Sequence, residues 1–394
     1  MTGQQNKPSL FQDKNLHIIF GITLIAVLGV ASITPAFPKV ARSLHLSEAE
    51  VAYLISVFTL PGIFLAPVGG ILADRYGRKT ILIPSLFLFG LAGFACFFTR
   101  NLHWLLVFRF LQGVGGSTLG TLNVTLIGDF FKGKQRAEAM GYNASVLSVG
   151  TGFYPFIGGM LAILGWNFPF LLPLLAIPVG LWAMAKLKPV ELHQSTGIGE
   201  YIRATYKSII KKEVLGLLSL SVLTFIILYG AFLSFLPFMF DKKLGLNSFQ
   251  IGLMLSLSSF STAFTSAQLG KLVRRFSEVD LLKVAYVLYF ISILSVPFID
   301  SVWIFLIPVI IFGVAQGLNI PGLQTLLIHL APEKQRAVFM SANGMVLRLG
   351  QTLGPIVIGW GVVGFGINGA FYLAASITIL MFLVVLFTLQ GLKK

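Results

Sequence analysis

The chain has 394 residues, of which 56% are hydrophobic and 11% are charged, and its formal net charge is +15 at pH 7. A soluble domain of this length cannot cover so much apolar surface, so the composition predicts an integral membrane protein. The basic residues lie between long apolar runs and form no clustered soluble face, which argues against nucleic acid as a partner. The single cysteine, Cys96, lies inside an apolar run and is expected to serve packing, because one thiol forms neither a disulfide framework nor a thiolate metal site.

The apolar runs predict twelve transmembrane helices. An α-helix needs roughly 20 residues to cross about 30 Å of hydrocarbon. In chain order, we expect helices at 17–38, 49–72, 80–99, 102–128, 137–163, 168–186, 214–240, 248–270, 280–299, 301–328, 337–360 and 368–390. Two long uncharged runs must contain a turn each, and glycine, asparagine and proline place these turns at 165–169 and 364–368.

The basic residues predict the orientation of these helices. Cytoplasmic loops of membrane proteins carry an excess of Lys and Arg. Most of the 29 basic residues lie at the termini and in one set of alternate loops. The opposite set holds Lys39, Arg42, Arg100, Lys242 and Lys243. We therefore expect a multi-pass protein of a bacterial cytoplasmic (inner) membrane with both termini in the cytoplasm, and the first helix, which lacks a cleavage pattern, is expected to be retained.

An internal repeat divides the chain. The segment KQRAEAMGYNASVLSVGTGFYPFIGG, which starts at Lys134, reappears about 200 residues later as KQRAVFMSANGMVLRLGQTLGPIVIGW, which starts at Lys334. We therefore predict an all-α fold with two pseudo-symmetric six-helix bundles, at 1–186 and 214–394, joined by a cytoplasmic linker at 187–213. Duplicated bundles that rock about a shared midplane site are the basis of alternating access, so the repeat favours a transporter over a channel or receptor.

The loop between the second and third helices carries a motif, with Gly70, Asp74, Arg75, Gly77, Arg78 and Lys79 at its defining positions. It resembles the signature of the major facilitator superfamily. The resemblance implies the fold of two six-helix bundles and a conformational latch that stabilises an outward-facing state. Asp74 is expected to pair with Arg78 or to meet the N-terminal end of the eleventh helix near Gln335. The bases could instead merely obey the positive-inside rule. The corresponding loop at 270–276 lacks the acid, so we expect the second latch to be degenerate.

The fourth and fifth helices carry two further motifs. Arg109 and Gln112 fit the family's Arg-x-x-Gln-Gly pattern, in which the arginine is associated with proton coupling; Arg109 could alternatively extend toward the outer headgroups. The fifth helix resembles the antiporter motif of the family's drug exporters, although Tyr154 stands where glycine is expected. The resemblance implies a helix bend. Its expected residues are Gly150, Pro155, Gly158, Gly159, Gly354 and Pro355.

The predicted spans contain no carboxylate at midplane, so simple exchange of protons for cationic drugs is doubtful. Arg348 lies about 18 Å beyond Arg336 along the eleventh helix and therefore close to midplane. Its guanidinium either holds an anionic group of a substrate or pairs with carbonyls and amides of a neighbouring helix. Further polar and aromatic candidates lie at similar depth, and some of them should line the cavity: Gln112, Asn123, Tyr142, Asn143, Tyr229, Asn319, Gln324, Asn343 and Gln351. The repeated Asn143/Asn343 pair could line the cavity or bind helices together.

These observations favour a secondary active transporter that exports small amphiphilic compounds or drugs by alternating access, coupled to protons. The alternative is a transporter of an organic anion held by the membrane arginines Arg109 and Arg348. We do not expect an enzyme, because the sequence contains no metal-ligand cluster, nucleophile elbow or ATP motif. We therefore expect no catalytic residue, no metal site and no bound cofactor, and the proton gradient is the expected driving force. A small-molecule substrate and the lipid bilayer are the expected partners of a functional monomer.

Overall fold

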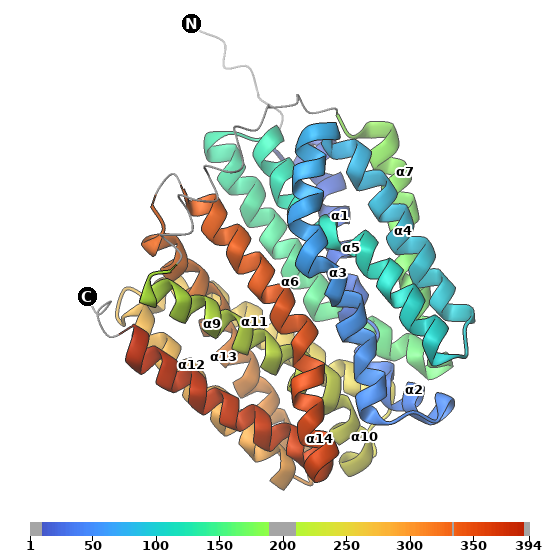
Figure 1. Ribbon diagram of the computed structural model, residues 1–394, viewed down its shortest axis with the longest axis vertical. Coiled ribbons are helices and arrows are strands. Elements are labelled where there is room, and N and C mark those ends of the chain that lie inside the picture. Colours follow the sequence, from blue (N-terminus) through green and yellow to red (C-terminus); the bar gives the residue numbers. More distant parts are fainter. Residues whose placement is uncertain (1–9, 189–209, 333–334, 390–394) are drawn as a thin grey trace, which may run out of the picture.

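The computed structural model describes residues 10–188, 210–332 and 335–389, and this part of the chain is helical without a strand. Most of the predicted linker, residues 189–209, lies outside the described residues, so the domain boundaries remain a prediction. The first bundle begins with a short turn, η1 (Leu10–Gln12), and contains α1 (Lys14–Ala31), η2 (Thr34–Ala36), α2 (Phe37–Leu44), α3 (Glu48–Tyr76), α4 (Arg78–Phe98), α5 (Leu102–Phe130), α6 (Gly133–Leu164), η3 (Phe168–Leu175) and α7 (Ala176–Lys186). We call it the N-terminal bundle (Figure 1).

The C-terminal bundle contains α9 (Lys212–Ile226), the π-helical segment η4 (Ile227–Phe235), α10 (Leu236–Leu244), α11 (Ser248–Leu272), α12 (Glu278–Ser295), η5 (Val296–Phe298), α13 (Val302–Leu330) and α14 (Arg336–Thr388). α14 is two helices joined at a break, where Phe365 and Gly366 leave helical geometry and Gly366 has φ of 66°. A positive φ is cheap only for glycine, so this residue permits the turn that the sequence predicts there.

The twelve-helix fold is confirmed. Nine stretches of the described chain are long and apolar enough to cross a membrane, and the last of them, Phe339–Thr388, contains both helices of α14. α5 and α11 complete the set with 29 and 25 residues. They are less apolar because glycine, serine and threonine are frequent in them, and these small residues allow close helix packing in membranes.

Equivalent caps start equivalent helices. Ser47 accepts from the backbone N–H of Glu50, whose carboxylate accepts from the N–H of Ser47, and this capping box begins α3. Asn247 and Gln250 form the same reciprocal pair at the start of α11. Each box satisfies N–H groups that a helix end leaves unpaired. The repeat thus extends to the local chemistry of its helix ends.

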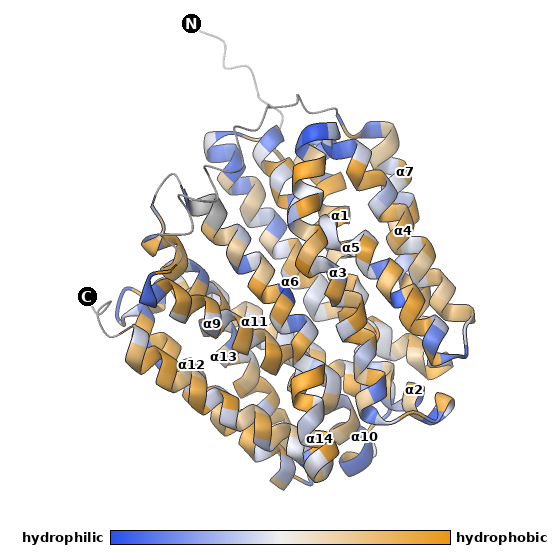
Figure 2. Cartoon of the chain, viewed as in Figure 1, coloured by the Kyte–Doolittle hydropathy of each residue, from blue (hydrophilic) through white to orange (hydrophobic). Residues whose placement is uncertain are grey.

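The outer surface of the bundles suits a lipid environment. In Figure 2 hydrophobic residues follow the lengths of the helices and hydrophilic residues gather at their ends. Trp104 and Trp303 are 59% and 80% exposed at helix ends, as interfacial anchors should be. Trp166 is instead 8% exposed, and the guanidinium of Arg100 lies over its ring.

Two helix pairs form most of the contact between the bundles, α6 with α11 and α3 with α14. A Cβ on Gly159 would lie 2.4 Å from the carbonyl oxygen of Ser248, and one on Gly252 would lie 2.3 Å from that of Pro155. Along the other pair, the Ser56 hydroxyl donates to the Thr352 carbonyl oxygen (2.8 Å). Figure 1 shows the bundles converging toward the end where α2 and α10 lie and diverging toward the opposite end.

Candidate functional site

A cavity of about 430 Å³ lies between the bundles. Its walls come from α1, α3, α5 and α6 on one side and from η4, α11, α13 and α14 on the other. Most of the lining is apolar, and the main contributors are Val27, Val30, Phe58, Leu147, Leu228, Phe232, Leu255 and Phe312. Its polar members include Asn123, Asn143, Tyr229, Gln316, Arg348 and Gln351. The volume and the mixture of apolar walls with a few polar groups suit a small amphiphilic ligand.

A polar triad joins three helices on the N-terminal side of the cavity. Asn123 of α5 donates to the hydroxyl of Thr23 in α1 (2.9 Å), and that hydroxyl also contacts the side-chain oxygen of Asn143 in α6 (2.5 Å). All three side chains are buried and line the cavity. Asn143 therefore both lines the cavity and binds helices together. Thr23 was not among the residues predicted from the sequence, although a hydroxyl within an apolar helix is a signal for such a bond.

The C-terminal bundle holds a related pair. Asn319 of α13 donates to the hydroxyl of Thr224 in α9 (2.7 Å), just as Asn123 donates to Thr23. Asn343, the repeat partner of Asn143, lies near Thr224 in a separate small pocket and does not line the central cavity. The buried oxygen of the Asn343 amide has no hydrogen-bond partner among the described residues. Of the two repeated asparagines, Asn143 lines the central cavity and Asn343 does not.

Tyr142 also departs from the prediction. Its hydroxyl bonds to the Glu138 carboxylate (3.1 Å), and its ring packs edge-on against Phe11. These contacts direct its side chain away from the central cavity, which Asn143 lines. Tyr142 is thus not a residue of the central cavity.

Arg109 and Gln112 lie behind the cavity wall, and neither lines the cavity. Both side chains are fully buried. The Arg109 guanidinium donates to the Leu54 carbonyl oxygen (3.1 Å) and to the Gln112 side-chain oxygen (2.7 Å), and its carbon lies 4.2 Å from the centre of the Phe58 ring. The alternative that Arg109 reaches the headgroups is therefore wrong. Phe58 separates this buried cation from the cavity.

Arg348 reaches the cavity from α14 and lies against the N-terminal bundle. A Cβ on Gly62 of α3 would lie 3.1 Å from its Cδ, and one on Gly120 of α5 would lie 3.5 Å from its Nη2. The guanidinium donates to the Gln351 side-chain oxygen on the next turn (3.0 Å). Arg348 lines the cavity, as do the candidates Gln351, Asn123 and Asn143, and their roles remain predictions.

The π-helical segment η4 supplies another part of the wall, and its π-helical geometry was not predicted from the sequence. Leu228, Tyr229, Phe232 and Leu233 all line the cavity. Gly230 faces the other way, where a Cβ would lie 2.5 Å from the Gly354 carbonyl oxygen of α14. A π-helical turn widens the helix and is frequent at functional sites. This close contact and the widened turn together direct the four side chains into the cavity.

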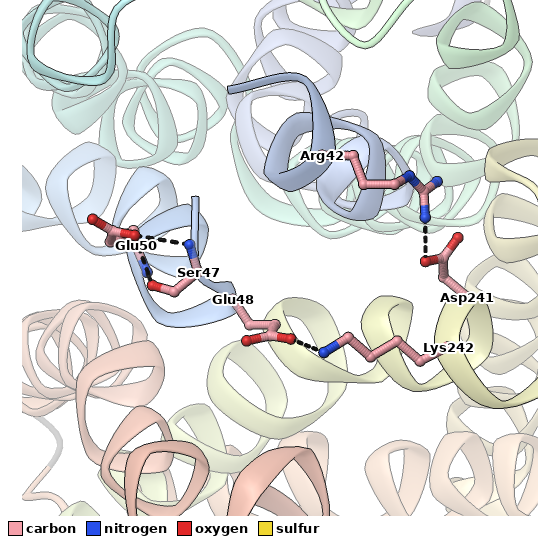
Figure 3. Close-up of polar contacts among 6 residues, drawn as sticks. All are labelled: Arg42, Ser47, Glu48, Glu50, Asp241 and Lys242. Atoms are coloured by element: carbon pink, nitrogen blue, oxygen red, sulfur yellow. Dashed lines mark hydrogen bonds and ion pairs between the residues drawn. The ribbon is translucent and has the colours of Figure 1, made fainter. Parts of the chain in front are cut away.

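Two ion pairs join the bundles at the end where the bundles converge (Figure 3). Arg42 of α2 contacts Asp241 of α10 (2.5 Å), and Glu48 at the start of α3 contacts Lys242 of α10. Each bundle thus contributes one base and one acid. We call these four residues the gate. The adjacent Lys243 instead contacts Asp300 (2.9 Å), which belongs to the same bundle.

At the opposite end, the residues of the predicted latch bond within the N-terminal bundle. Arg78 contacts both Asp74 and Asp129, the latter at 3.0 Å. The expected Asp74–Arg78 pair is confirmed as a contact. Lys79 donates to the Leu187 carbonyl oxygen (3.3 Å) and the Arg75 guanidinium lies over the Tyr76 ring. Gly77 has φ of 100° and allows the turn between α3 and α4, whereas a Cβ on Gly70 would meet no atom within 4 Å.

The second loop inverts the charges of the first. Glu278 lies at the position equivalent to Arg78, and His329 at the position equivalent to Asp129. The imidazole Nδ1 of His329 lies 3.6 Å from the Glu278 carboxylate. Arg274 stands where the first loop has Asp74, and the acid of the second loop is instead Glu278, which lies beside His329. This arrangement agrees with a degenerate second latch.

The glycines of the predicted bend motif allow close packing. A Cβ on Gly158 would lie 1.7 Å from the Ser32 carbonyl oxygen, and one on Gly150 would lie 3.1 Å from side-chain atoms of α1. Gly354 lies equally close to the backbone of α9 and η4. Pro155 lies inside α6, and Pro355 lies inside the first of the two helices of α14. The bend itself remains a prediction, whereas the thin helix surfaces are present.

The sequence matches a family profile and two exporters, and the fold resembles that of a solved transporter. The profile described as Major Facilitator Superfamily matches residues 19–346 and 218–393. The chain is 26% identical over 398 residues to the "Bacillibactin exporter" of Bacillus subtilis (strain 168), covering 97% of this chain and 98% of that protein. It is 26% identical to "Multidrug resistance protein 1" of the same organism, covering 92% and 94%. The crystal structure of the nucleoside transporter NupG superposes with a TM-score of 0.80 at 14% identity, covering 96% and 100% of the two chains.

Proposed function

Because the chain belongs to the Major Facilitator Superfamily, we propose that it exports small amphiphilic compounds or drugs by alternating access. Relatives named as a bacillibactin exporter and a multidrug resistance protein match nearly its whole length and support this direction and substrate class. The observation that carries the proposal is the cavity between the bundles, whose walls are mainly apolar with a few amides. These names do not favour the alternative of a transporter dedicated to organic anions.

The state of the two ends supports a transport cycle. The gate closes the end that the distribution of bases assigns to the outside, so this conformation faces the cytoplasm. The Asp74–Arg78 pair stays within one bundle here, and its role as a latch would begin when the cytoplasmic ends close. Loss of the gate and formation of the latch would then accompany the opposite, outward-facing state. Both termini would lie in the cytoplasm, and a monomer contains the whole cavity.

Proton coupling forms part of the proposal, with the gradient as the driving force and no bound cofactor. Among the described residues that line the cavity, none is a carboxylate. The buried Arg109, with its Gln112 and Phe58 contacts, is therefore our candidate for the coupling group. It is buried with no carboxylate partner in the part of the chain that the structure describes, which makes it sensitive to any charge that approaches the cavity wall.

Transport by the full chain in proteoliposomes tests this function. We expect an imposed pH gradient to drive uptake or release of fluorescent amphiphiles, tested with ethidium, dansylglycine and dansylglycinamide, and an uncoupler to abolish it. Gly120→Phe should block transport by filling the cavity, whereas Gly141→Phe, where no atom lies within 4 Å of an added Cβ, serves as the control. Movement of none of the three probes, or movement indifferent to the uncoupler, would contradict the proposal.

A further inference from the structure

The described lining of the central cavity carries a positive charge with no negative charge beside it. Arg348 is the one formally charged side chain among the described residues that line it. The other polar members are hydroxyls and amides, such as Tyr229, Gln316 and Gln351. A cation in a low-dielectric cavity is costly unless an anion or several dipoles accompany it. The protein provides dipoles here, and the anion has to come from outside.

The Arg348 side chain is held in position but its hydrogen-bonding capacity is largely unused. The guanidinium has five N–H groups, and one described bond, to Gln351, uses one of them. Gly62 and Gly120 leave the space that the side chain occupies at the seam between the bundles. A guanidinium fixed in this way offers two parallel N–H groups in the geometry that a carboxylate accepts.

The surroundings define the rest of the ligand. Phe232 and Phe312 stack face to face with their ring centres 4.1 Å apart, and both line the cavity. Phe58 and Leu147 line the facing wall. These surfaces suit a flat or branched apolar body, while Asn143 and Gln351 offer amide groups beside it.

Arg109 offers no comparable site. It is fully buried, it donates to Leu54 and Gln112, and the Phe58 ring covers it. A ligand in the cavity therefore meets Arg348 first and reaches Arg109 only through Phe58. The two membrane arginines therefore have different surroundings.

We propose that the cavity preferentially binds amphiphiles that carry an acidic group, with the carboxylate held by Arg348 and the apolar body held against the aromatic wall. This inference rests on the proposed export function and specifies which substrates the site prefers. It does not restrict transport to anions, because most of the contact area is apolar.

Two probes that differ in one group test the preference. Dansylglycine carries a carboxylate, and dansylglycinamide replaces it with a neutral amide. Fluorescence titration of the purified full chain should show about tenfold tighter binding of the acid, the amount that one charge-assisted pair contributes. Arg348→Gln should remove this difference, and Arg348→Lys should keep part of it. Lys271→Gln removes an exposed base outside the cavity and should keep the whole preference.

The outcomes separate this inference from the proposed function. Equal binding of the two probes by the unchanged protein, or a preference that survives Arg348→Gln, would overturn the inference. If Arg348→Gln fails to fold, the comparison of probes on the unchanged protein and on Arg348→Lys still decides. Gradient-driven transport of dansylglycinamide in proteoliposomes would leave the export function standing even when the acid is not preferred.

Discussion

Reversing one charge of the gate should shift the protein toward its outward-facing state. Lys242→Glu removes the contact with Glu48 and places two carboxylates together at the start of α3. The side chains of Lys242 and Glu48 are 55% and 21% exposed, and a pair of this exposure contributes about 0.2–1 kcal/mol. The new repulsion adds a similar amount, so the total is about 0.4–2 kcal/mol, or about twofold to thirtyfold in the ratio of the two states.

Disulfide trapping measures this ratio. A Cβ on Gly359 of α14 would lie 4.0 Å from that of Ala49 in α3, which is within the range for a disulfide. The buried Cys96 would first be replaced by alanine. Cysteines at positions 49 and 359 should then crosslink in the state described here, and Lys242→Glu should lower the yield of the crosslink at low ionic strength, with a smaller effect at high salt.

A matched control and a charge swap make this prediction specific. Lys243→Gln removes a neighbouring base of α10 whose contacts, Asp300 and the Pro297 carbonyl oxygen, belong to its own bundle, so the crosslink should be unchanged. Combining Lys242→Glu with Glu48→Lys should restore the yield, because the pair re-forms with opposite signs. A yield that Lys242→Glu leaves unchanged, or that the swap fails to restore, would refute the gate.

Two predictions concern packing. Gly158→Ala should lower the free energy of unfolding by about 1–3 kcal/mol, because its Cβ would lie 1.7 Å from the Ser32 carbonyl oxygen. A lower unfolding temperature in detergent would report this loss. Gly141→Ala, in the same helix but with no atom within 4 Å, should be neutral or slightly stabilising; equal melting of the two variants would contradict this account. Thr23→Val should cost about 1–3 kcal/mol, measured in the same way, because it leaves buried amides such as Asn143 unpaired. A variant as stable as the unchanged protein would show that these bonds contribute no net stability.

The sequence predicts most of the fold because hydrocarbon thickness fixes helix length and the repeat fixes the pairing of bundles. The turn near Gly366 followed from glycines in an uncharged run, and the structure has it there. The depth of Arg348 followed from counting residues along a helix. Such inferences need only one helix at a time, which explains why they succeed.

Predictions that required the facing of a side chain were less reliable. Tyr142 and Asn143 have the same depth, yet only Asn143 lines the cavity, because the Tyr142 side chain contacts Glu138 and Phe11 instead. The π-helical turn at η4 changes the helical rotation locally, and no residue in it announces the change. The gate also escaped prediction, because its pairs join residues that are 194 or more positions apart. The depth of a residue in the membrane follows from its position in one helix, whereas the direction of its side chain relative to the cavity depends on how two helices pack.

α3 connects the ends of the proposed cycle. It starts at Glu48 in the gate and carries Asp74 of the latch near its other end, about 39 Å away at 1.5 Å per residue. Midway, Thr59 shares a hydrogen bond with Thr352 of α14 (2.9 Å), and Arg348 lies against α3 one turn further on. A tilt about this midpoint would open one end as it closes the other. A ligand on Arg348 would lie at the pivot, where it can balance the charge while displacing either end least.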